Sequence, residues 1–405
     1  MNFLTSRWKR VSFYLLFFLL IYVTGTSAFA QKAFTDSSLV FDPGEKFATV
    51  RIPALVMTNK GSLLAFAEGR LNGHGDWAAI DILLRRSTDG GKTWGDVITL
   101  VEHDSKNTPT SNATPIVDKD GTIHFLYQRN YDHAYYIKST DDGNTWSEPI
   151  DITYVFETFR KDYNWKVIAP GPGHAIQLKN GRLLVPVWLC EPDKSRPGGD
   201  HRPSCIATIY SDDHGATWKR GDIVVNNGDT VQGIRVVNPS ENVAIELADG
   251  RVLLNMRTES VNHERLIAYS KDGATGWTKP VFDPELYDPV CMASLIRVSG
   301  VPKGKTRILF VNPDTKNDTT VVNKNNFRKR ENITAFMSYD EGETWPVKKS
   351  LFPGISGYSD LAAGKDGTIY CLYERRDSSE GVGYSKFKVV LKKFNVAWLT
   401  DGKDK

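Results

Sequence analysis

Polar turns alternate with short runs of β-branched and other apolar residues along almost the whole chain. Six turns of the Lys-Gly, Asn-Gly or Asp-Gly type are each followed by such a run, and their glycines are Gly61, Gly121, Gly181, Gly250, Gly304 and Gly367. Asn-Gly and Asp-Gly before β-branched residues are typical of β-hairpins, because glycine supplies the positive φ that primed turns need. The glycines recur about every 61 residues, so six such units account for nearly all of the chain after its first 30 residues.

A second marker runs in phase with these turns. Four octets fit the pattern Ser-x-Asp-x-Gly-x-Thr-Trp and a fifth is a degenerate copy: Ser87–Trp94, Ser139–Trp146, Ser211–Trp218, Ser338–Trp345 and the degenerate Ser270–Trp277. Asp, Gly and Thr favour a turn, and we expect the tryptophan to be buried between strands. Units of about 60 residues with four strands each are typical of propeller blades. The pattern predicts an all-β fold: a six-bladed β-propeller of four-stranded antiparallel blades, with strands from the two chain ends closing the sixth blade.

The first 30 residues follow a different pattern. Arg7, Lys9 and Arg10 precede an apolar run at 11–23, and small residues lead to an Ala-x-Ala ending at residue 30, which is typical of a secretory signal peptide. The run is shorter than the roughly 20 residues that a membrane helix needs, so an uncleaved signal anchor is the weaker alternative. We therefore expect residues 1–30 to be a signal peptide and residues 31–405 to be one propeller domain. The mature protein would be exported, periplasmic or secreted, without a stable membrane anchor.

Composition and charge narrow the function classes. The 405-residue chain has 40% hydrophobic and 24% charged residues, which is globular composition. Loss of the three leader bases leaves 48 basic residues (51 − 3) against 48 acidic ones, and this neutral balance gives no argument for nucleic acid as a partner. Four cysteines are too few for a disulfide framework; Cys190 and Cys205 could close a hairpin, but we favour buried free thiols in strands.

Several common catalytic motifs do not occur in the sequence. There is no Ser-His-Asp order, His-Glu-x-x-His helix, paired CxxC or phosphate loop, so serine hydrolysis, zinc chemistry and nucleotide binding have no support. We expect no metal and no cofactor.

The octets are Asp boxes, and with the Arg51-Ile52-Pro53 opening they make the chain resemble the bacterial exo-α-sialidases (neuraminidases), which are Asp-box or BNR-repeat glycoside hydrolases. The resemblance covers essentially all of residues 40–400. Asp boxes mark the fold and say little about chemistry, because one fold hosts many functions and binding propellers carry the boxes too. Candidate chemistry must therefore come from other residues.

Arginines from three predicted blades match the residues that hold the substrate carboxylate in this family. They are Arg51, Arg257 after the Asp249-Gly250 hairpin, and Arg330, with Arg328 open as the alternative for the third. A guanidinium stays charged at any working pH and offers a fork of donors that fits a carboxylate. Arg70 resembles a family residue that contacts a ring hydroxyl. For any single arginine the alternative is a surface or inter-blade ion pair.

Tyr358 matches the family's nucleophile, and Glu241 matches the base that activates it. Sialidases are an exception among glycosidases in using a tyrosine. A carboxylate attacking a carbon that bears a carboxylate would meet like-charge repulsion, whereas a neutral phenol avoids it. A phenol with its ordinary pKa of about 10 is a weak nucleophile and needs a base. Glu374 lies 16 residues after Tyr358 across a hairpin, and the resemblance implies that it orients Arg51.

The acid that protonates the leaving oxygen is expected on a Gly-rich loop near the inner strand of the first blade. Asp76, in the segment 71–77, has the position along the chain that the resemblance to the family implies for this acid. The alternative is an ordinary aspartate in a turn. Desolvation on substrate binding would raise its pKa toward the working pH, as general-acid catalysis requires. His174 resembles part of a family loop, and we favour a structural role for it.

The resemblance implies a retaining exo-α-sialidase that removes terminal sialic acid from glycoproteins, glycolipids or oligosaccharides. Asp76, Glu241 and Tyr358 would be catalytic, and Arg51, Arg70, Arg257, Arg330 and Glu374 would form the substrate-binding set. Two alternatives stay open: an Asp-box propeller that binds glycans without catalysis, and a hydrolase or trans-sialidase for a related nonulosonic acid.

Overall fold

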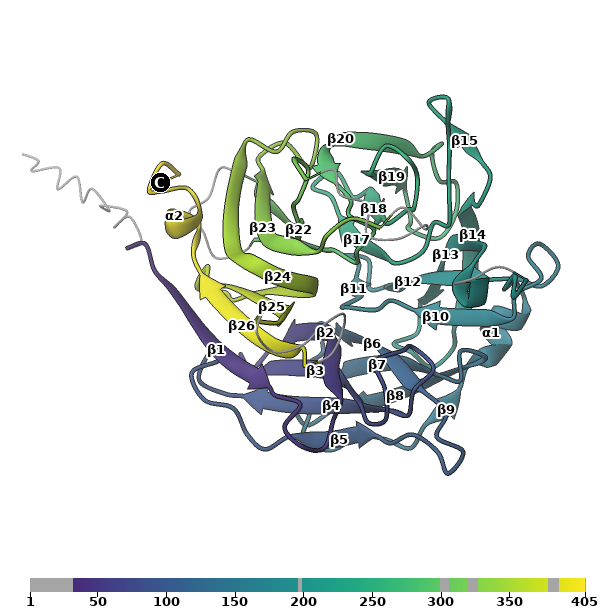
Figure 1. Cartoon of the computed structure of the whole chain (residues 1–405), viewed down its shortest axis with the longest axis horizontal. Helices are drawn as coiled ribbons and strands as arrows, with labels where there is room; N and C mark the ends of the chain where they lie inside the picture. Colours follow the sequence, from purple (N-terminus) through teal and green to yellow (C-terminus); the bar gives the residue numbers. More distant parts are fainter. Residues whose placement is uncertain (1–31, 196–198, 299–305, 319–326, 378–385, 405) are drawn as a thin grey trace, which may run out of the picture.

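The computed structural model describes residues 32–195, 199–298, 306–318, 327–377 and 386–404, and within these ranges the chain is built almost wholly of β-strands (Figure 1). Helical structure in this part is limited to short pieces: α1 (Thr153–Glu157), the 3₁₀ turn η1 (Gly199–His201) and α2 (Val396–Leu399). None of the described helices has the length and hydropathy needed to cross a membrane. The predicted signal peptide at 1–30 and the turn at Gly304 lie outside the described residues.

Four sheets each consist of strands that follow one another in the chain and pair antiparallel. The first contains β2 (Thr49–Met57), β3 (Leu63–Arg70), β4 (Ile80–Ser87) and β5 (Ile98–Val101). The second contains β6 (Thr110–Val117), β7 (Ile123–Arg129), β8 (His133–Ser139) and β9 (Ile150–Asp151). The third contains β10 (Val167–Pro170), β12 (Leu183–Cys190), β13 (Ser204–Ser211) and β14 (Lys219–Asn226), with β11 (Ile176–Gln177) also paired to β12. The fourth contains β17 (Asn242–Glu246), β18 (Val252–Met256), β19 (Glu264–Ser270) and β20 (Val281–Tyr287), and β15 (Thr230–Val231) with β16 (Ile234–Arg235) forms a small ribbon.

The remaining strands form one seven-stranded sheet in the order β21-β22-β23-β24-β25-β26-β1. Their bounds are β21 (Ser294–Arg297), β22 (Ile308–Pro313), β23 (Glu331–Ser338), β24 (Val347–Ala363), β25 (Ile369–Arg375), β26 (Lys388–Phe394) and β1 (Thr35–Phe41). The strand β24 is 17 residues long; its part up to Ile355 pairs with β23, and its part from Ser356 pairs with β25. Because β1 pairs with β26, strands from the two chain ends share a sheet, which confirms that part of the sequence prediction.

The sheets are arranged like the blades of a propeller around a centre (Figure 1). Strands of successive sheets meet there in turn: β2 contacts β6, β6 contacts β10 and β11, β12 contacts β17, β17 contacts β21, β21 contacts β24, and β24 contacts β2. The series of contacts returns to its start. Residues carried by strands far apart in the sequence therefore come together near the centre.

The hairpin turns have the backbone geometry that the sequence predicts. Five of the six glycines lie in the described part of the chain, and Gly61, Gly121, Gly181, Gly250 and Gly367 all have φ between 83° and 98°. This left-handed region is accessible to glycine at little cost, whereas a residue with a Cβ is strained there. The Lys-Gly and Asp-Gly pairs thus fix where one strand ends and the next begins.

The Asp boxes form the turns that the sequence predicts, through their own side chains. In the first box Asp89 accepts hydrogen bonds from Thr93 Oγ1 at 2.6 Å and from the backbone N–H of Lys92 at 3.0 Å, while Ser87 Oγ accepts one from Gly91 N at 2.9 Å. The aspartate–threonine bond recurs in the other three complete boxes, at Asp141, Asp213 and Asp340. A carboxylate that accepts several local donors replaces backbone hydrogen bonds that the turn cannot make.

The box tryptophans are less uniformly buried than the sequence predicts. Trp218 and Trp345 are buried, whereas Trp94, Trp146 and Trp277 pack against the clusters between sheets and keep part of the indole in contact with solvent. The expected burial is therefore complete for two of the five tryptophans and partial for the other three.

The fourth residue of several boxes reaches the preceding sheet. Asp142 of the second box accepts a hydrogen bond from Ser62 Oγ at 2.6 Å in the β2–β3 turn, and Glu341 accepts one from Ala248 N at 2.7 Å in the β17–β18 turn. These contacts add to the apolar clusters between neighbouring sheets, such as the one that joins Phe66 of the first sheet to Phe125 of the second with ring centroids 4.8 Å apart. The boxes therefore tie neighbouring sheets together at their turns.

All four cysteines are buried and free. Cys190, Cys205 and Cys371 lie in strands, as we expected, and Cys291 lies in the segment before β21. Burial raises the pKa of the Cys205 thiol, which keeps it uncharged and poorly reactive.

Candidate active site

The eight residues singled out from the sequence come together near the centre of the molecule. Six of them line a cavity of about 280 Å³. The residues lining it are Arg51, His74, Gly75, Asp76, Trp188, His201, Arg202, Asn238, Ser240, Glu241, Arg257, Phe327, Arg330 and Tyr358. The other two, Arg70 and Glu374, lie directly behind Asp76 and Arg51 and contact them. Residues separated by more than 300 positions in the chain therefore form one site.

Irregularities in the inner strands aim the side chains into this cavity. The pairing of β2 with β3 shifts register between Arg51 and Ala54, and Ile52 has a φ of 55°. A β-branched residue in the left-handed region is strained, and such strain is held by surrounding contacts at functional sites. The pairing of β24 with β25 shifts in the same way between Ser356 and Ser359, which flank Tyr358. The two bulges carry the candidate arginine and the candidate nucleophile.

Tyr358, Glu241 and Arg257 form a compact triad. The Tyr358 hydroxyl donates a hydrogen bond to Glu241 Oε1, Arg257 Nη1 lies 2.8 Å from the same hydroxyl, and Arg257 also pairs with Glu241 Oε2. All three residues are less than 10% exposed. Burial and then the charge of Glu241 raise the pKa of Tyr358, against the opposing effect of Arg257, so the phenol is neutral in the free protein. Glu241 is the group placed to receive its proton.

Glu374 holds Arg51 and the backbone around it. Its carboxylate is fully buried and lies 3.1 Å from Arg51 Nε and 3.2 Å from Arg51 Nη2. It also accepts hydrogen bonds from the backbone N–H groups of Ile52 at 2.9 Å and Tyr358 at 3.0 Å. A Cβ at Gly357 would lie 2.0 Å from Glu374 Oε2, so only glycine permits this close approach. One carboxylate thus fixes both the arginine and the tyrosine.

The two candidates for the third arginine lie in different surroundings. Arg330 lines the cavity, its guanidinium carbon lies 5.3 Å from the centre of the Tyr358 ring, and it donates to the carbonyl of Val290. Arg328 donates instead to His263 Nε2 at 3.0 Å and does not line the cavity. Arg51 lies on the tyrosine ring as well, at 5.4 Å from its centre. Arg51, Arg257 and Arg330 therefore converge around Tyr358.

Asp76 lies at the edge of the cavity on the loop between β3 and β4. Its side chain is 45% exposed, and its Oδ1 lies 2.9 Å from Arg70 Nη1. Partial burial raises the pKa of Asp76, but the positive charge of Arg70, joined by that of His201 when its ring is protonated and by that of Arg51, outweighs it and holds that pKa well below its usual range. In the free protein Asp76 is therefore a carboxylate.

Two residues that support Asp76, Glu68 and His201, were not predicted from the sequence. Arg70 is fully buried and is held by Glu68, whose Oε2 lies 2.8 Å from Arg70 Nη2. His201 lies on the far side of Asp76, with Nδ1 at 3.7 Å from Asp76 Oδ2. Glu68 occurs two residues before Arg70 on one strand, where side chains of alternate residues share a face, so this spacing was a usable signal. Nothing in the sequence around His201 indicates its position.

Phe327 and Trp188 complete the wall of the cavity. The Phe327 ring faces three guanidinium carbons, those of Arg330, Arg202 and Arg257, at 5.5, 5.6 and 5.7 Å. Such cation–aromatic contacts stabilise closely spaced positive charges by about 1 kcal/mol each. The Phe327 ring thus helps to hold the three positively charged guanidinium groups close together.

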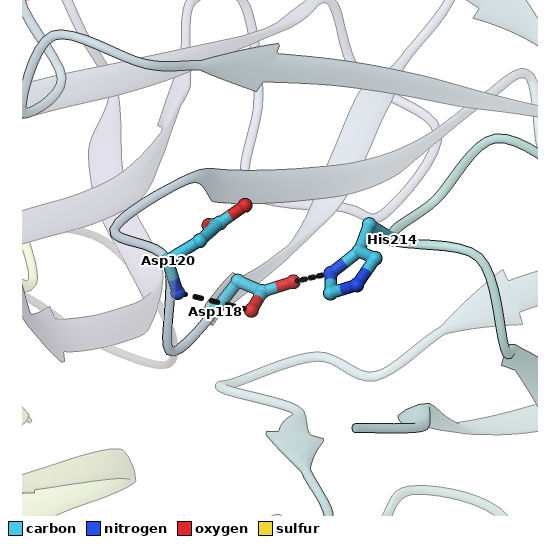
Figure 2. A group of neighbouring side chains, drawn as sticks. All are labelled: Asp118, Asp120 and His214. Atoms are coloured by element: carbon cyan, nitrogen blue, oxygen red, sulfur yellow. Dashed lines mark hydrogen bonds and ion pairs between the residues drawn. The ribbon is translucent and has the colours of Figure 1, made fainter.

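One cluster outside this cavity has the composition of a metal site. Asp118, Asp120 and His214 offer ligand atoms within 4.8 Å of one another, and Figure 2 shows the His214 ring directed at the Asp118 carboxylate. Asp118 already accepts from His214 Nδ1 at 2.7 Å and from Gln177 Nε2 at 2.8 Å, and His124 Nε2 lies 3.3 Å away. The hydrogen bond with Asp118 raises the pKa of His214, which favours the protonated ring that cannot bind a metal. The cluster ties the third Asp box to the β6–β7 turn.

His174 takes part in a buried network outside the candidate site. Its Nδ1 lies 2.6 Å from Asp360 Oδ1, and Asp360 also accepts from Ser294 Oγ and from Leu55 N, each at 2.8 Å. The network joins β2, β21 and β24 near the centre. His174 lines a second cavity of about 480 Å³ whose lining is largely apolar and contains none of the eight candidate residues. This position agrees with the structural role that we favoured.

Comparison with known proteins supports the resemblance. The model of the BNR repeat-like domain family matches residues 53–371. The sialidase of Micromonospora viridifaciens is 33% identical over 401 residues, covering 91% of this chain and 55% of the relative. The sialidase of Bacteroides fragilis is 30% identical over 388 residues, covering 85% of this chain and 63% of the relative. The chain thus spans between half and two thirds of the length of these two relatives.

A solved structure gives the same result. A Hadza microbial sialidase superimposes with a TM-score of 0.70 and 28% identity, covering 87% of this chain and 67% of that chain. The all-β, propeller-like arrangement is therefore shared with a sialidase along most of the present chain.

Proposed function

The chain belongs to the BNR repeat-like family that includes sialidases, and from this premise we propose that it is a retaining exo-α-sialidase. It would hydrolyse terminal α-linked sialic acid from glycoproteins, glycolipids or oligosaccharides. One observation carries the proposal: the Tyr358 hydroxyl is hydrogen-bonded to the Glu241 carboxylate within a cavity that three buried or half-buried arginines surround. A purely glycan-binding propeller has no need for a phenol paired with a base.

The arginines provide the substrate carboxylate with its binding site. Arg51 lies in β2, Arg257 directly follows β18 and Arg330 directly precedes β23, and all three guanidinium groups lie against the same phenol. Their combined charge attracts an anion, and their forked donors match its two oxygens. In this arrangement the carboxylated anomeric carbon of a sialic acid is held next to Tyr358 Oη.

The proposed first step forms a bond between Tyr358 Oη and the anomeric carbon. Glu241 takes the phenol proton, Arg257 stabilises the charge that develops on the oxygen, and the bond to the aglycone breaks. Asp76 supplies the proton that the departing oxygen needs, so it must be protonated when substrate is bound. Displacement of water by the substrate raises the pKa of Asp76 from its low value in the free protein, in the direction that this step requires.

The proposed second step reverses these roles. Asp76, now a carboxylate, removes a proton from water, and the water oxygen attacks the anomeric carbon. The bond to Tyr358 breaks, and the phenolate recovers its proton from Glu241. Two displacements at one carbon give net retention of configuration.

We also propose that the architecture has six blades and that the protein is exported. The seven-stranded sheet divides at β24, whose two parts pair with different neighbours, and this supports counting it as two four-stranded blades. The contacts of the inner strands form a closed series, which supports the same count. Export, to the periplasm or the medium, is supported by the leader-like sequence at 1–30.

The test is release of sialic acid from an aryl α-sialoside by purified residues 31–405, measured beside Tyr358→Phe. We expect turnover by the parent and its collapse in the variant, with substrate affinity changed far less, because the ring that packs beneath the arginines remains. Absence of turnover in a folded parent between pH 4 and 8, with natural sialosides also tried, would overturn the proposal.

A further inference from the structure

The imidazole of His201 is enclosed by aromatic rings at the edge of the candidate site. The Trp77 ring stacks on it with centroids 5.6 Å apart, Tyr131 lies at 4.8 Å, and Trp188 meets it edge-on at 5.6 Å. These contacts come from three different segments of the chain. The ring orientation is therefore set by packing and does not depend on a hydrogen bond to a charged group.

This orientation directs Nδ1 of His201 toward Asp76. Nδ1 lies 3.7 Å from Asp76 Oδ2, whereas Arg70 binds the other carboxylate oxygen at 2.9 Å. Nε2 is buried, and within the described part of the chain it has no hydrogen-bond partner. Of the two neutral tautomers, the one with its proton on Nδ1 gains the attraction of Asp76, so the N–H points at Oδ2.

Both signs of charge surround this pair. The charged or titratable groups that face His201 or Asp76 are Arg70, Arg51, Arg202, Asp200, Glu241 and Tyr131. Burial lowers the pKa of His201 and outweighs the opposing effect of Asp76, so the ring is neutral at neutral pH. A neutral N–H donor stabilises a carboxylate more than a carboxylic acid.

We infer that His201 is a positioning residue for Asp76. His201 directs its Nδ1–H at Asp76 Oδ2 and keeps that oxygen oriented toward the cavity. Arg70 binds one oxygen at 2.9 Å, and His201 faces the other at 3.7 Å, close enough for electrostatic attraction but longer than a hydrogen bond. This inference rests on the proposed function only for its kinetic consequence.

The kinetic consequence has a defined sign. If His201 stabilises the ionised form of Asp76, its removal raises the pKa of Asp76. Asp76 then stays protonated up to a higher pH. The basic limb of the kcat profile, which reports the protein with substrate bound, should move upward by about half to one pH unit, the size expected for loss of one neighbouring donor to a carboxylate.

The kinetic experiment compares the pH profiles of two variants on an alkyl α-sialoside, whose leaving group requires protonation. His201→Phe keeps a ring for the aromatic enclosure and removes the donor. His201→Asn keeps an N–H near the position of Nδ1. We expect the basic limb to move upward in His201→Phe and to return toward the parent's position in His201→Asn. His133→Phe, a change at an exposed histidine that pairs with Asp132, is the matched control and should leave the profile unchanged.

A second readout needs no turnover. The His201 ring resonance is titrated by NMR in the parent and in Asp76→Asn, with assignment from its loss in His201→Phe. Because the Asp76 charge favours the imidazolium, Asp76→Asn should lower the midpoint of His201 by about half a unit or more, and the exposed control Asp96→Asn should not.

These readouts separate the two proposals. An inactive parent with the expected NMR shift would overturn the sialidase function and leave the His201–Asp76 pairing intact. An unshifted His201 titration, or a His201→Phe profile that superimposes on that of the parent, would overturn the positioning role. Equal losses of kcat in both His201 variants with no movement of the limb would assign His201 to packing alone.

Discussion

Glu374→Gln is the substitution whose consequences the geometry defines best. The carboxylate is fully buried, and each of its oxygens serves one backbone N–H and one nitrogen of Arg51. A glutamine of the same shape must turn its NH₂ group toward one of these donor pairs. Whichever way it turns, one backbone N–H, of Ile52 or of Tyr358, loses its acceptor, and the buried charge of Arg51 loses its partner.

The expected cost follows from these losses. Removing one member of a buried ion pair typically costs about 3–5 kcal/mol, because the remaining charge is left without compensation. A typical domain has a free energy of unfolding of about 5–15 kcal/mol, so this is a large fraction. Arg51 and Tyr358 would also lose their common support, and we expect KM to rise and kcat to fall together.

Urea unfolding measures the first effect and steady-state hydrolysis the second. The matched control is Glu148→Gln, which makes the same change at an exposed position and should alter the free energy of unfolding by less than about 0.5 kcal/mol. A Glu374→Gln protein as stable as that control, with unchanged KM, would refute the role assigned to this carboxylate.

Three further outcomes are expected from the same geometry. Arg51→Lys should raise KM at least tenfold in steady-state hydrolysis, because a point charge cannot replace the fork that spans Glu374 and a substrate carboxylate (roughly 1.4 kcal/mol per factor of ten); an unchanged KM would count against the clamp. Arg330→Ala should raise KM strongly whereas Arg328→Ala should not, and the opposite order would reverse the choice of third arginine. Burial of the ring lowers the pKa of His174, but the charge of Asp360 and its hydrogen bond outweigh this effect. The pKa of His174 is therefore raised above its unfolded value of about 6.5. Stability from this pair is then complete below pH 6.5 and is lost as pH rises through the folded pKa; His174→Gln should flatten this dependence in urea unfolding, and an unaltered slope would contradict it.

Much of the fold could be predicted because its signals are local. A glycine that must adopt positive φ and an aspartate that bonds a threonine four residues on leave their mark within eight residues of sequence. The prediction that the two chain ends share a sheet followed from counting these units. The extent of β24 could not be predicted, because Pro353-Gly354 is a dipeptide typical of a turn and yet lies within this one strand.

The candidate site was predictable for a different reason. Its eight residues match motifs of the family that the chain resembles, and in the structure all of them lie at one cavity or directly behind it. Residues outside those motifs were missed. His201 and Phe327 act through contacts with segments more than 50 residues away, and such contacts depend on how the sheets are arranged, which no local pattern records.

In the proposed mechanism Tyr358 forms a covalent bond with the anomeric carbon of the substrate. Incubation of the protein with 2,3-difluorosialic acid, which slows breakdown of such an intermediate, followed by mass spectrometry of the intact chain and its peptides, tests this directly. We expect one added 3-fluorosialyl group, formed as the fluoride at the anomeric carbon leaves, located on the peptide that contains Tyr358 and absent in Tyr358→Phe. An adduct on Glu241 or Asp76, or an unmodified protein that nevertheless turns over substrate, would contradict it.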